Sequence, residues 1–263
     1  MSRIIAITNQ KGGVGKTTTS VNLAASLSAV KRRVLLVDID PQANATTGMG
    51  VDKHNQALSL SSVLLGEGDV QDVLVEINSD AQFDILPSSP DMTVAEVQLM
   101  DKDDREFRLK EVLDSIRDNY EYILIDCPPS LNMLTVNALV AADEVIIPMQ
   151  CEYYALEGLS ALIDTIGSIQ ESANPKLELK GLLRTMFDPR SNLSRDVSNQ
   201  LNHHFADKLY NTSIPRNIRL AEAPSHGMPV LKYDKNSRGT LAYLAFAAEM
   251  LRKDSTTPQH TSH

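Results

Sequence analysis

A glycine-rich segment near the start of the chain lies directly between an apolar strand pattern and a helical pattern. Residues 9–18 read Asn9-Gln10-Lys11-Gly12-Gly13-Val14-Gly15-Lys16-Thr17-Thr18. A phosphate chain needs backbone N–H groups that no Cβ obstructs, the positive end of a helix, and a cation that reaches the terminal phosphates. The segment contains all three. It therefore restricts the fold to one in which a strand, a phosphate-binding loop and a helix follow one another.

Strand-length and helix-length apolar patterns alternate along the remaining chain. We expect strands over residues 3–8, 34–38, 83–87, 122–126, 144–149 and 179–187, and helices over residues 17–30, 107–119 and 156–170. Strands this apolar are typical of parallel sheets covered on both faces. The sequence thus predicts an α/β fold of the P-loop NTPase type. This is a doubly wound, mostly parallel sheet with helices on both faces and its ligand at the carboxyl ends of the strands.

Composition excludes several protein classes. Of the 263 residues, 42% are hydrophobic and 22% are charged, and no run of 18 apolar residues occurs. Disordered, fibrous and membrane-spanning chains do not have this composition. With only two cysteines and no apolar secretory segment at its start, the chain is expected in the reducing cytoplasm. We expect one domain over residues 1–252 and a polar, disordered tail over residues 253–263.

Charge is distributed unevenly along the chain. The formal net charge is −9, which excludes a protein that coats polyanions indiscriminately. Residues 52–121 carry 6 basic and 17 acidic side chains, whereas residues 176–238 carry 11 basic and 6 acidic side chains. The basic excess is either ordinary solvated surface or a surface for a polyanion. Its position relative to the phosphate-binding loop decides between the two.

The parts of a phosphate site can be assigned to side chains of the loop. The glycines leave the backbone open, Lys16 is expected to bridge the β- and γ-phosphates, and the Thr17 hydroxyl stands where P-loops hold Mg²⁺. The loop departs from the common G-x-x-x-x-G-K-[ST] pattern, because Gln10 stands at the first glycine and Lys11 is an additional lysine. Lys11 has no evident function within one subunit, since Lys16 already serves the phosphates.

Three aspartates follow strand patterns. Asp126 ends the apolar strand over residues 122–126, where a carboxylate can hold a magnesium-bound water; a strand-capping aspartate is the alternative. Asp38 and Asp40 are two residues apart at the end of another strand and therefore face the same side. A turn-forming role, which Pro41 would suit, is the alternative for this pair.

Four ordered segments resemble one family. Residues 11–18 resemble the deviant Walker A motif of the ParA/MinD ATPase superfamily, and three later segments resemble motifs of its ParA/Soj partition branch. The later segments read Val37-Asp38-Ile39-Asp40-Pro41-Gln42-Ala43-Asn44-Ala45-Thr46, Ile125-Asp126-Cys127-Pro128-Pro129-Ser130, and Ile214-Pro215-Arg216-Asn217-Ile218-Arg219-Leu220-Ala221-Glu222-Ala223-Pro224-Ser225-His226-Gly227. The resemblance implies a Mg²⁺-dependent ATPase with slow turnover that hydrolyses ATP to ADP and phosphate and partitions a chromosome or plasmid.

The resemblance also implies roles for individual residues. Residues 11–18, Val14 and Thr18 included, would contact ATP, Asp40 would orient the attacking water, and Asp38 would support the magnesium shell. Lys11 would cross to the nucleotide of a second subunit, so that ATP pairs two protomers; a surface lysine flanking the loop is the alternative. Adenine would be enclosed by Met186 at a strand end and by a turn of Pro215, Arg216 and Asn217. The alternative for this turn is a common loop with no ligand.

Partners follow from the same resemblance. The ATP-bound homodimer would bind nucleoid DNA without sequence preference through a basic region, with Arg190 and Arg219 at matching positions and further charge from Lys232, Lys235 and Arg238. An ion pair with Glu222 is the alternative for Arg219. A ParB-like centromere-binding protein would stimulate hydrolysis, and its basic segment would complement the acidic residues 52–121.

Two other functions share this loop. A MinD-like division-site ATPase would need a basic amphipathic C-terminal helix for the membrane, and residues 251–263 have no apolar face, so we expect no membrane partner. A metabolic ATP-using enzyme, such as a nitrogenase-type reductase, would need a cluster-binding cysteine pair or a second substrate pocket. Cys127 and Cys151 are more simply small buried apolar residues.

Overall fold

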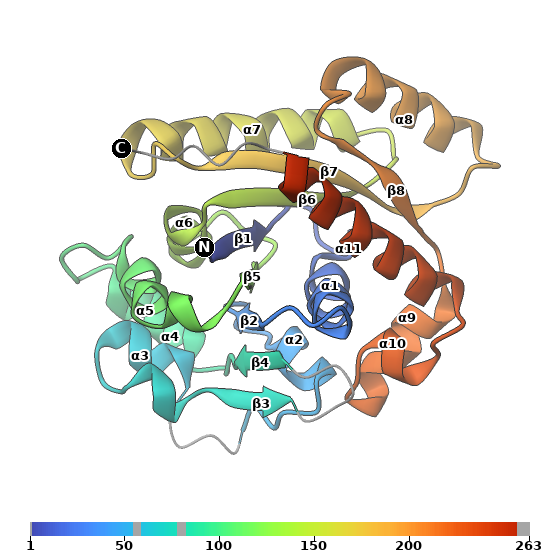
Figure 1. The fold of residues 1–263 in the computed structure, drawn as a ribbon. Helices are drawn as coiled ribbons and strands as arrows, with labels where there is room; N and C mark the ends of the chain where they lie inside the picture. Colours follow the sequence, from blue (N-terminus) through green and yellow to red (C-terminus); the bar gives the residue numbers. More distant parts are fainter. Residues whose placement is uncertain (1, 55–58, 78–82, 257–263) are drawn as a thin grey trace.

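The computed structural model describes residues 2–54, 59–77 and 83–256 (Figure 1). Its centre is an eight-stranded sheet in the order β3-β4-β2-β5-β1-β6-β7-β8. All neighbouring strands are parallel except the edge pair β3 and β4. The strands are β1 (Arg3–Ile7), β2 (Val34–Asp38), β3 (Val75–Ile77), β4 (Phe83–Leu86), β5 (Tyr122–Asp126), β6 (Glu144–Gln150), β7 (Glu178–Phe187) and β8 (Leu209–Pro215).

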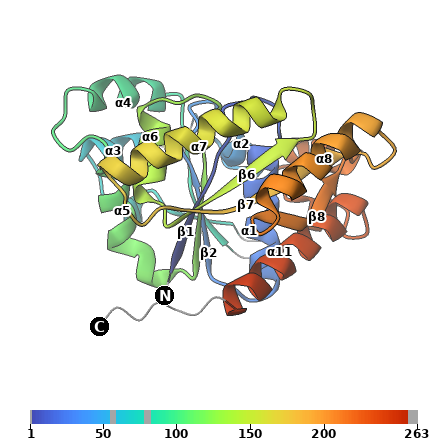
Figure 2. The same cartoon turned by 90° about the horizontal axis from the view of Figure 1, so that it is seen from above.

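Helices cover both faces of the sheet, as Figures 1 and 2 show. One face is covered by α3 (Leu60–Leu65), α4 (Met92–Leu99), α5 (Arg108–Ile116), α6 (Met133–Ala141), α7 (Ala155–Ser172) and α8 (Asn192–Phe205). The other is covered by α1 (Lys16–Ala29), α2 (Asn44–Gly48), α9 (Ile218–Glu222), α10 (Val230–Tyr233) and α11 (Arg238–Thr256). The 3₁₀ turns are η1 (Val70–Asp72), η2 (Arg117–Asn119) and η3 (Ala223–His226).

Alternating side chains of the central strands form two separate hydrophobic cores. In β1, Ile4 and Ala6 pack into the core under α3–α8, whereas Ile5 and Ile7 pack into the core under α1 and α11. All four are at most 1% exposed. A strand buried on both faces needs apolar residues at every position, which explains the continuous apolar runs in the sequence. The predicted doubly wound α/β fold is therefore confirmed.

Most predicted elements lie within one or two residues of the observed ones. Two strands were not predicted. β3 has only three residues, and β8 carries the polar run Asn211-Thr212-Ser213, which is typical of a loop. The predicted helix over residues 107–119 is divided into α5 and η2.

The C-terminal helix extends into the segment that the sequence predicts as a tail. α11 continues to Thr256, and the Asp254 carboxylate accepts hydrogen bonds from Lys180 Nζ at 2.6 Å and from the Tyr122 hydroxyl at 2.8 Å. Arg3 forms a third contact with Asp254. Residues 253–256 are thus part of the helix, whose end these buried charges hold on the sheet. Residues 257–263 lie outside the described chain. Within the described ranges, no helix has the length and apolarity needed to cross a bilayer.

Candidate nucleotide-binding site

The carboxyl ends of three adjacent strands bring the predicted site residues together. β1 leads into the glycine-rich loop, β2 ends at Asp38 and β5 ends at Asp126. In the sheet register, Asp126 lies opposite both Ile7 and Asp38. The phosphate-binding loop and both carboxylates therefore meet at one edge of the sheet, as the order of strands in a doubly wound fold requires.

The glycine-rich loop forms an open cradle. Gly13 and Gly15 have φ of +74° and +89°, which side chains rarely adopt. A Cβ added at Gly12 or Gly13 would meet no atom within 4 Å, so the space over the loop is free for phosphate oxygens. The helix α1 starts directly behind the cradle and points its N–H groups at that space.

Neighbouring strand ends hold the loop in place. Asn9 Nδ2 donates to the carbonyl of Pro148 at 2.8 Å, and Gln150 Nε2 donates to the carbonyl of Gly13 at 2.8 Å. From β7, the Thr185 hydroxyl donates to the carbonyl of Val14 at 2.7 Å. The cradle is thus preorganised by β6 and β7.

Lys16 is buried beneath the cradle. Its ammonium donates to the carbonyl of Lys11 at 3.3 Å. Burial lowers the pKa of Lys16, whereas the nearby Asp126, Cys127 and Asp40 favour its charged form. A desolvated ammonium with one weak backbone partner is suited to bind a phosphate anion.

Asp126 is fully buried and has an oxygen available for a cation. Its Oδ1 accepts from the Ser20 hydroxyl at 2.8 Å, whereas Oδ2 has no hydrogen-bond partner. Burial and the charge of Asp38 raise the pKa of the Asp126 carboxyl, although the hydroxyls of Thr17 and Ser20 oppose the rise. An orphaned buried carboxylate oxygen beside a threonine hydroxyl is the hard-oxygen donor set that Mg²⁺ prefers. The residues therefore fit the ion.

Asp38 is largely occupied by the backbone that follows it. Its Oδ2 accepts from the Thr46 amide and from the Thr46 hydroxyl, both at 2.8 Å, and Oδ1 accepts from the Asp40 amide at 3.2 Å. Burial raises the pKa of Asp38 despite these hydrogen bonds. Asp38 thus anchors the loop that carries Asp40, in addition to lying beside Asp126. The nearly buried Asp40 accepts from the Gln42 amide at 2.9 Å.

Lys11 has a partner within its own subunit, which the sequence did not predict. Its ammonium forms an ion pair with Glu152, and both side chains are about half exposed. Tyr153 and Tyr154 follow, 76% and 70% exposed, at the same edge of the molecule. Lys11 therefore lies on an accessible surface beside the cradle rather than inside it.

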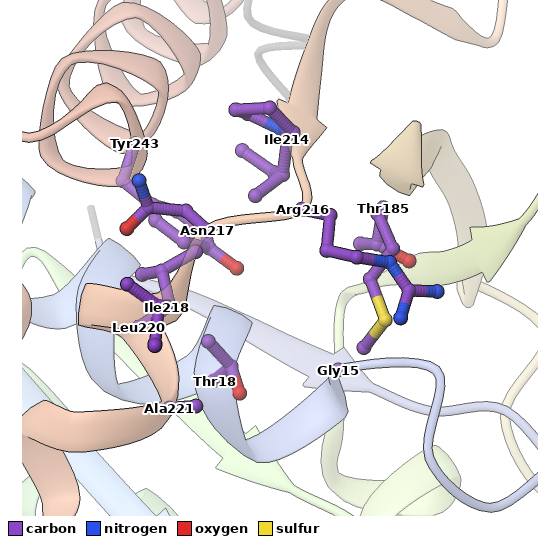
Figure 3. Close-up of a pocket in the computed structure, with 12 residues that line it drawn as sticks. Gly15, Thr18, Thr185, Ile214, Arg216, Asn217, Ile218, Leu220, Ala221 and Tyr243 are labelled. Atoms are coloured by element: carbon purple, nitrogen blue, oxygen red, sulfur yellow. The ribbon is translucent and has the colours of Figure 1, made fainter. Parts of the chain in front are cut away.

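A cavity of about 450 Å³ adjoins the cradle and contains the predicted adenine residues (Figure 3). Met186, Pro215, Arg216 and Asn217 all line it, together with Gly15 and Thr18 from the loop. Met186 has a φ of 48°, a strained backbone conformation for a side chain of its size, and such strain concentrates at ligand sites. The walls are mainly apolar, as a purine ring requires.

The predicted DNA-contacting residues come from separate elements. Arg190, with its side chain 88% exposed, lies between β7 and α8 and pairs with Asp188 at 3.0 Å. Arg219 on α9 pairs with Glu222 at 2.7 Å and with Asp234 at 3.3 Å, so the ion pair of the alternative interpretation is formed. The remaining residues are exposed on α10 and around the start of α11, namely Lys232, Lys235 and Arg238.

Sequence reasoning missed several residues of the site. Ser20 binds Asp126, Gln150 and Thr185 hold the loop, and Tyr243 lines the cavity with its hydroxyl 3.1 Å from that of Thr19. Ser20 stands one helical turn after Lys16, a spacing that places it on the side of the phosphate lysine. The other three are distant in sequence and carry no local signal. Cys127 and Cys151 are buried, as their apolar interpretation expects.

Comparison with known proteins identifies relatives over nearly the whole chain. A family model described as an AAA domain matches residues 2–179. The Bacillus subtilis sporulation initiation inhibitor protein Soj is 51% identical over 95% of this chain and 98% of its own length. The Myxococcus xanthus chromosome partitioning protein ParA is 48% identical over 97% of this chain and 90% of its own. An uncharacterised Pseudomonas putida protein is 60% identical over 99% of this chain and all of its own.

Solved structures share the fold. One is the Mycobacterium smegmatis cobyrinic acid a,c-diamide synthase with a bound ATP analogue and magnesium, 37% identical over 97% of both chains with a TM-score of 0.82. Another is the Pyrococcus furiosus cell division ATPase MinD, 27% identical over 96% of this chain and all of its own with a TM-score of 0.80. The cradle, the paired carboxylates and the full-length relatives agree, and the chain belongs to the ParA/Soj family of chromosome-partitioning ATPases.

Proposed function

We propose that this protein is a nucleotide-switched DNA-segregation ATPase. It binds ATP with Mg²⁺ in the cradle, pairs with a second copy, binds nucleoid DNA without sequence preference, and returns to single subunits after hydrolysis to ADP and phosphate. The observation that carries the proposal is the open cradle with Lys16 and the orphaned Asp126 oxygen, in a chain 51% identical to Soj.

The residues of this chain position the phosphates and the water. Magnesium, when bound, neutralises phosphate charge. Thr17 and Asp126 would hold the ion, with Asp38 in support. Lys16 binds the terminal phosphates, and Asp40 orients the attacking water. Because Asp40 sits on a loop that Asp38 anchors, its carboxylate has a fixed position.

Lys11 would make the pairing of two subunits depend on bound ATP. It lies half exposed at the carboxyl edge, bound only to Glu152 among the side chains that the structure describes. An exposed ion pair is worth about 0–1 kcal/mol, so exchange for the phosphates of a second subunit's ATP is favourable. Lys11→Ala is expected to remain a single subunit in gel filtration with ATP. Unchanged dimerisation would remove the bridging role.

Pairing would allow a net-acidic protein to bind DNA. One subunit presents few basic side chains, and a dimer doubles the surface and gains affinity through avidity. Arg190 and Arg219 would exchange their carboxylate partners for phosphates. A ParB-like partner bound at centromere-like DNA would then stimulate hydrolysis and release the dimer.

A DNA-binding assay in four nucleotide states tests the proposal. Wild type is measured with no nucleotide, ADP, ATP and a nonhydrolysable analogue, and Asp40→Ala serves as the form locked with ATP. We expect tight binding only with ATP or its analogue, and persistent binding by Asp40→Ala with ATP. Equal binding by nucleotide-free protein would contradict the switch, and a single-subunit state with ATP would contradict the pairing.

An ATP-using synthase is the second candidate, because a structure with that name is 37% identical. Such an enzyme would bind ATP and convert cobyrinic acid to its a,c-diamide. The partition relatives are more similar, at 48–51% identity. We therefore expect no conversion of cobyrinic acid, whereas DNA should bind in the same preparation.

A further inference from the structure

One pair of residues in the sheet contacts both the phosphate cradle and the base cavity. Gln150, the last residue of β6, lies opposite Thr185 of β7 in the strand register. We call these two residues the Gln150–Thr185 pair. They lie at the carboxyl edge of the sheet, where the cradle adjoins the cavity, and Figure 3 shows Thr185 beside Gly15 at the cavity wall.

Gln150 contacts the two parts of the site with one amide group. Its Nε2 donates to the carbonyl of Gly13 at 2.8 Å. The same nitrogen donates at 3.2 Å to the sulfur of Met186, which lines the base cavity. An amide nitrogen carries two hydrogens, so one can serve the cradle and the other the cavity. Because both partners are acceptors, only the nitrogen end of the side chain can face them.

Thr185 makes the equivalent contacts from the neighbouring strand. Its hydroxyl donates to the carbonyl of Val14 at 2.7 Å. A Cβ added to Gly15 would lie 3.9 Å from Thr185 Cγ2, so the methyl group of Thr185 packs beside the loop. Thr185 is 2% exposed and also lines the base cavity. Each member of the pair therefore joins one loop carbonyl to the wall of the cavity.

These hydrogen bonds orient two consecutive peptide groups of the cradle. Both groups are trans, so the N–H of each points away from the carbonyl of the residue before it. With the Gly13 and Val14 carbonyls held by the pair, the N–H groups of Val14 and Gly15 point away from it. The sign of φ also alternates along the loop, with +74° at Gly13, a negative value at Val14 and +89° at Gly15. Such alternation makes successive N–H groups converge on an anion.

We propose that the Gln150–Thr185 pair couples the two halves of the nucleotide site, so that a purine in the cavity raises the affinity of the cradle for phosphate. The inference rests on the proposed function and deepens it, since it concerns how that ATPase recognises its nucleotide. A purine that covers Met186 restricts the half-buried Gln150 side chain and, through it, the Gly13 carbonyl. A purine against Thr185 acts in the same way on Val14. The phosphate chain then meets donors that are already in place, and its binding requires less ordering.

The coupling discriminates between nucleotides and bare phosphate chains. A phosphate chain without a base meets a cradle whose donors are less well ordered, and it has to order them itself. A complete nucleoside triphosphate orders them through its base. A purely structural pair would hold the loop equally in both cases, and base and phosphate would then bind independently.

The test measures pyrophosphate binding with Mg²⁺ by titration calorimetry, with and without saturating adenosine. Pyrophosphate occupies the cradle without a base, and adenosine occupies the cavity without a phosphate. In wild type we expect adenosine to raise the affinity for pyrophosphate about fivefold or more, the lower end of typical coupling between sites. Gln150→Met and Thr185→Val nearly keep the side-chain volume and remove the donor, so each should reduce this gain to less than about twofold.

Two matched controls remove the same kinds of donor elsewhere. On α7, Gln170 Nε2 donates to the carbonyl of Leu177 at 2.6 Å, and the Thr165 hydroxyl donates to the carbonyl of Ala161 at 3.0 Å. Gln170→Met and Thr165→Val should keep the full gain. The affinity for adenosine alone should be the same in all four variants and in wild type, which shows that the cavity is intact.

Each outcome bears on a separate part of the inference. Independent binding of adenosine and pyrophosphate to a wild type that binds ATP overturns the coupling alone. A full gain in both Gln150→Met and Thr185→Val overturns the role of the pair. The two variants change different strands, so if one fails to fold, the other decides. A wild type that binds neither ATP nor pyrophosphate overturns the proposed nucleotide switch as well.

Discussion

At the scale of single residues, the site stores electrostatic strain in two neighbouring carboxylates. Asp38 and Asp126 lie opposite each other in adjacent strands and are fully buried, and that burial raises the pKa of both carboxyls. The charge of Asp38 adds to the rise at Asp126, and the charge of Asp40 adds to the rise at Asp38. A carboxyl whose pKa is raised by folding contributes stability at a pH below its unfolded pKa of 3.8. That contribution is lost as the pH rises through the folded pKa. A bound cation would relieve the strain, so ligand binding and stability are linked.

Asp126→Asn should therefore make the ligand-free protein more stable. Removing one charge ends the repulsion, and we expect Tm in EDTA at neutral pH to rise by about 2–4 °C, which corresponds to about 1 kcal/mol for a chain of this size. The same variant should lose the increase in Tm that Mg²⁺ and ATP give the wild type. Asp103→Asn, an exposed neutralisation, serves as the control and should change neither value. A lower Tm of Asp126→Asn in EDTA would contradict the repulsion between the two carboxylates.

At the scale of elements, two glycines allow α2 to lie against η3. Gly50 and Gly227 have φ of +75° and +63°, and a Cβ on Gly227 would stand 2.8 Å from Gly50 Cα. This contact joins the residues directly after α2 to the residue directly after η3.

Gly227→Ala should destabilise the protein more than an equally strained control. The positive φ costs about 1 kcal/mol, and overpacking against a backbone atom adds about 1–3 kcal/mol. Gly66 has a φ of +81° with nothing within 4 Å of an added Cβ. Gly66→Ala should therefore cost only the about 1 kcal/mol of the positive φ, without the overpacking. Urea unfolding measures both variants. Equal losses would show that the close approach of Gly50 and Gly227 has no energetic consequence.

The edge strand β8 depends on a carboxylate from α11. Glu249 accepts from the Asn211 amide at 2.7 Å and from the Thr212 amide at 2.8 Å. Burial opposes its ionisation, but these hydrogen bonds outweigh burial and lower the pKa of Glu249. A carboxyl whose pKa is lowered by folding contributes stability at a pH above its unfolded pKa of 4.5. That contribution is lost as the pH falls through the folded pKa.

Glu249→Gln should reduce stability at neutral pH by about 1–3 kcal/mol, because one amide loses its charged acceptor. The difference from wild type should shrink as the pH falls below the unfolded pKa of 4.5 and through the lower folded pKa, below which both side chains are neutral. The exposed substitution Glu67→Gln is the control. A difference that stays constant between acid and neutral pH would contradict the role of the charge.

The same elements show what the sequence could predict. Strands buried on both faces are continuous apolar runs, so β1, β2 and β5 were evident. β8 is polar at its exposed positions and is recognised only through its partners β7 and Glu249, which are distant in sequence. In the site, the cradle is one local segment and was predicted, whereas Gln150 reaches Gly13 across 137 residues. Contacts between residues that are distant in sequence leave no local pattern, so they could not be predicted.

At the scale of the whole molecule, charge of opposite sign lies on opposite faces of the sheet. The acidic residues 52–121 include α3, α4 and α5 on one face, whereas basic residues 216–238 belong to the face with α9, α10 and α11 (Figure 1). A DNA duplex on the face with α9, α10 and α11 would therefore leave α3, α4 and α5 available to a protein partner. Arg190, which precedes α8, would contribute its charge from the end of β7.

The salt dependence of DNA binding should depend on pairing for the same reason. If an ATP-bound dimer neutralises about four phosphates, its affinity falls about 100-fold between about 50 and about 200 mM salt, from a slope of about −0.9 per phosphate. Lys11→Ala, which stays single, offers half the contacts, so its affinity should be weaker and fall only about 10-fold over that range. Fluorescence anisotropy with a short duplex measures both slopes. Equal slopes would mean that one subunit makes every phosphate contact and that pairing controls something other than DNA affinity.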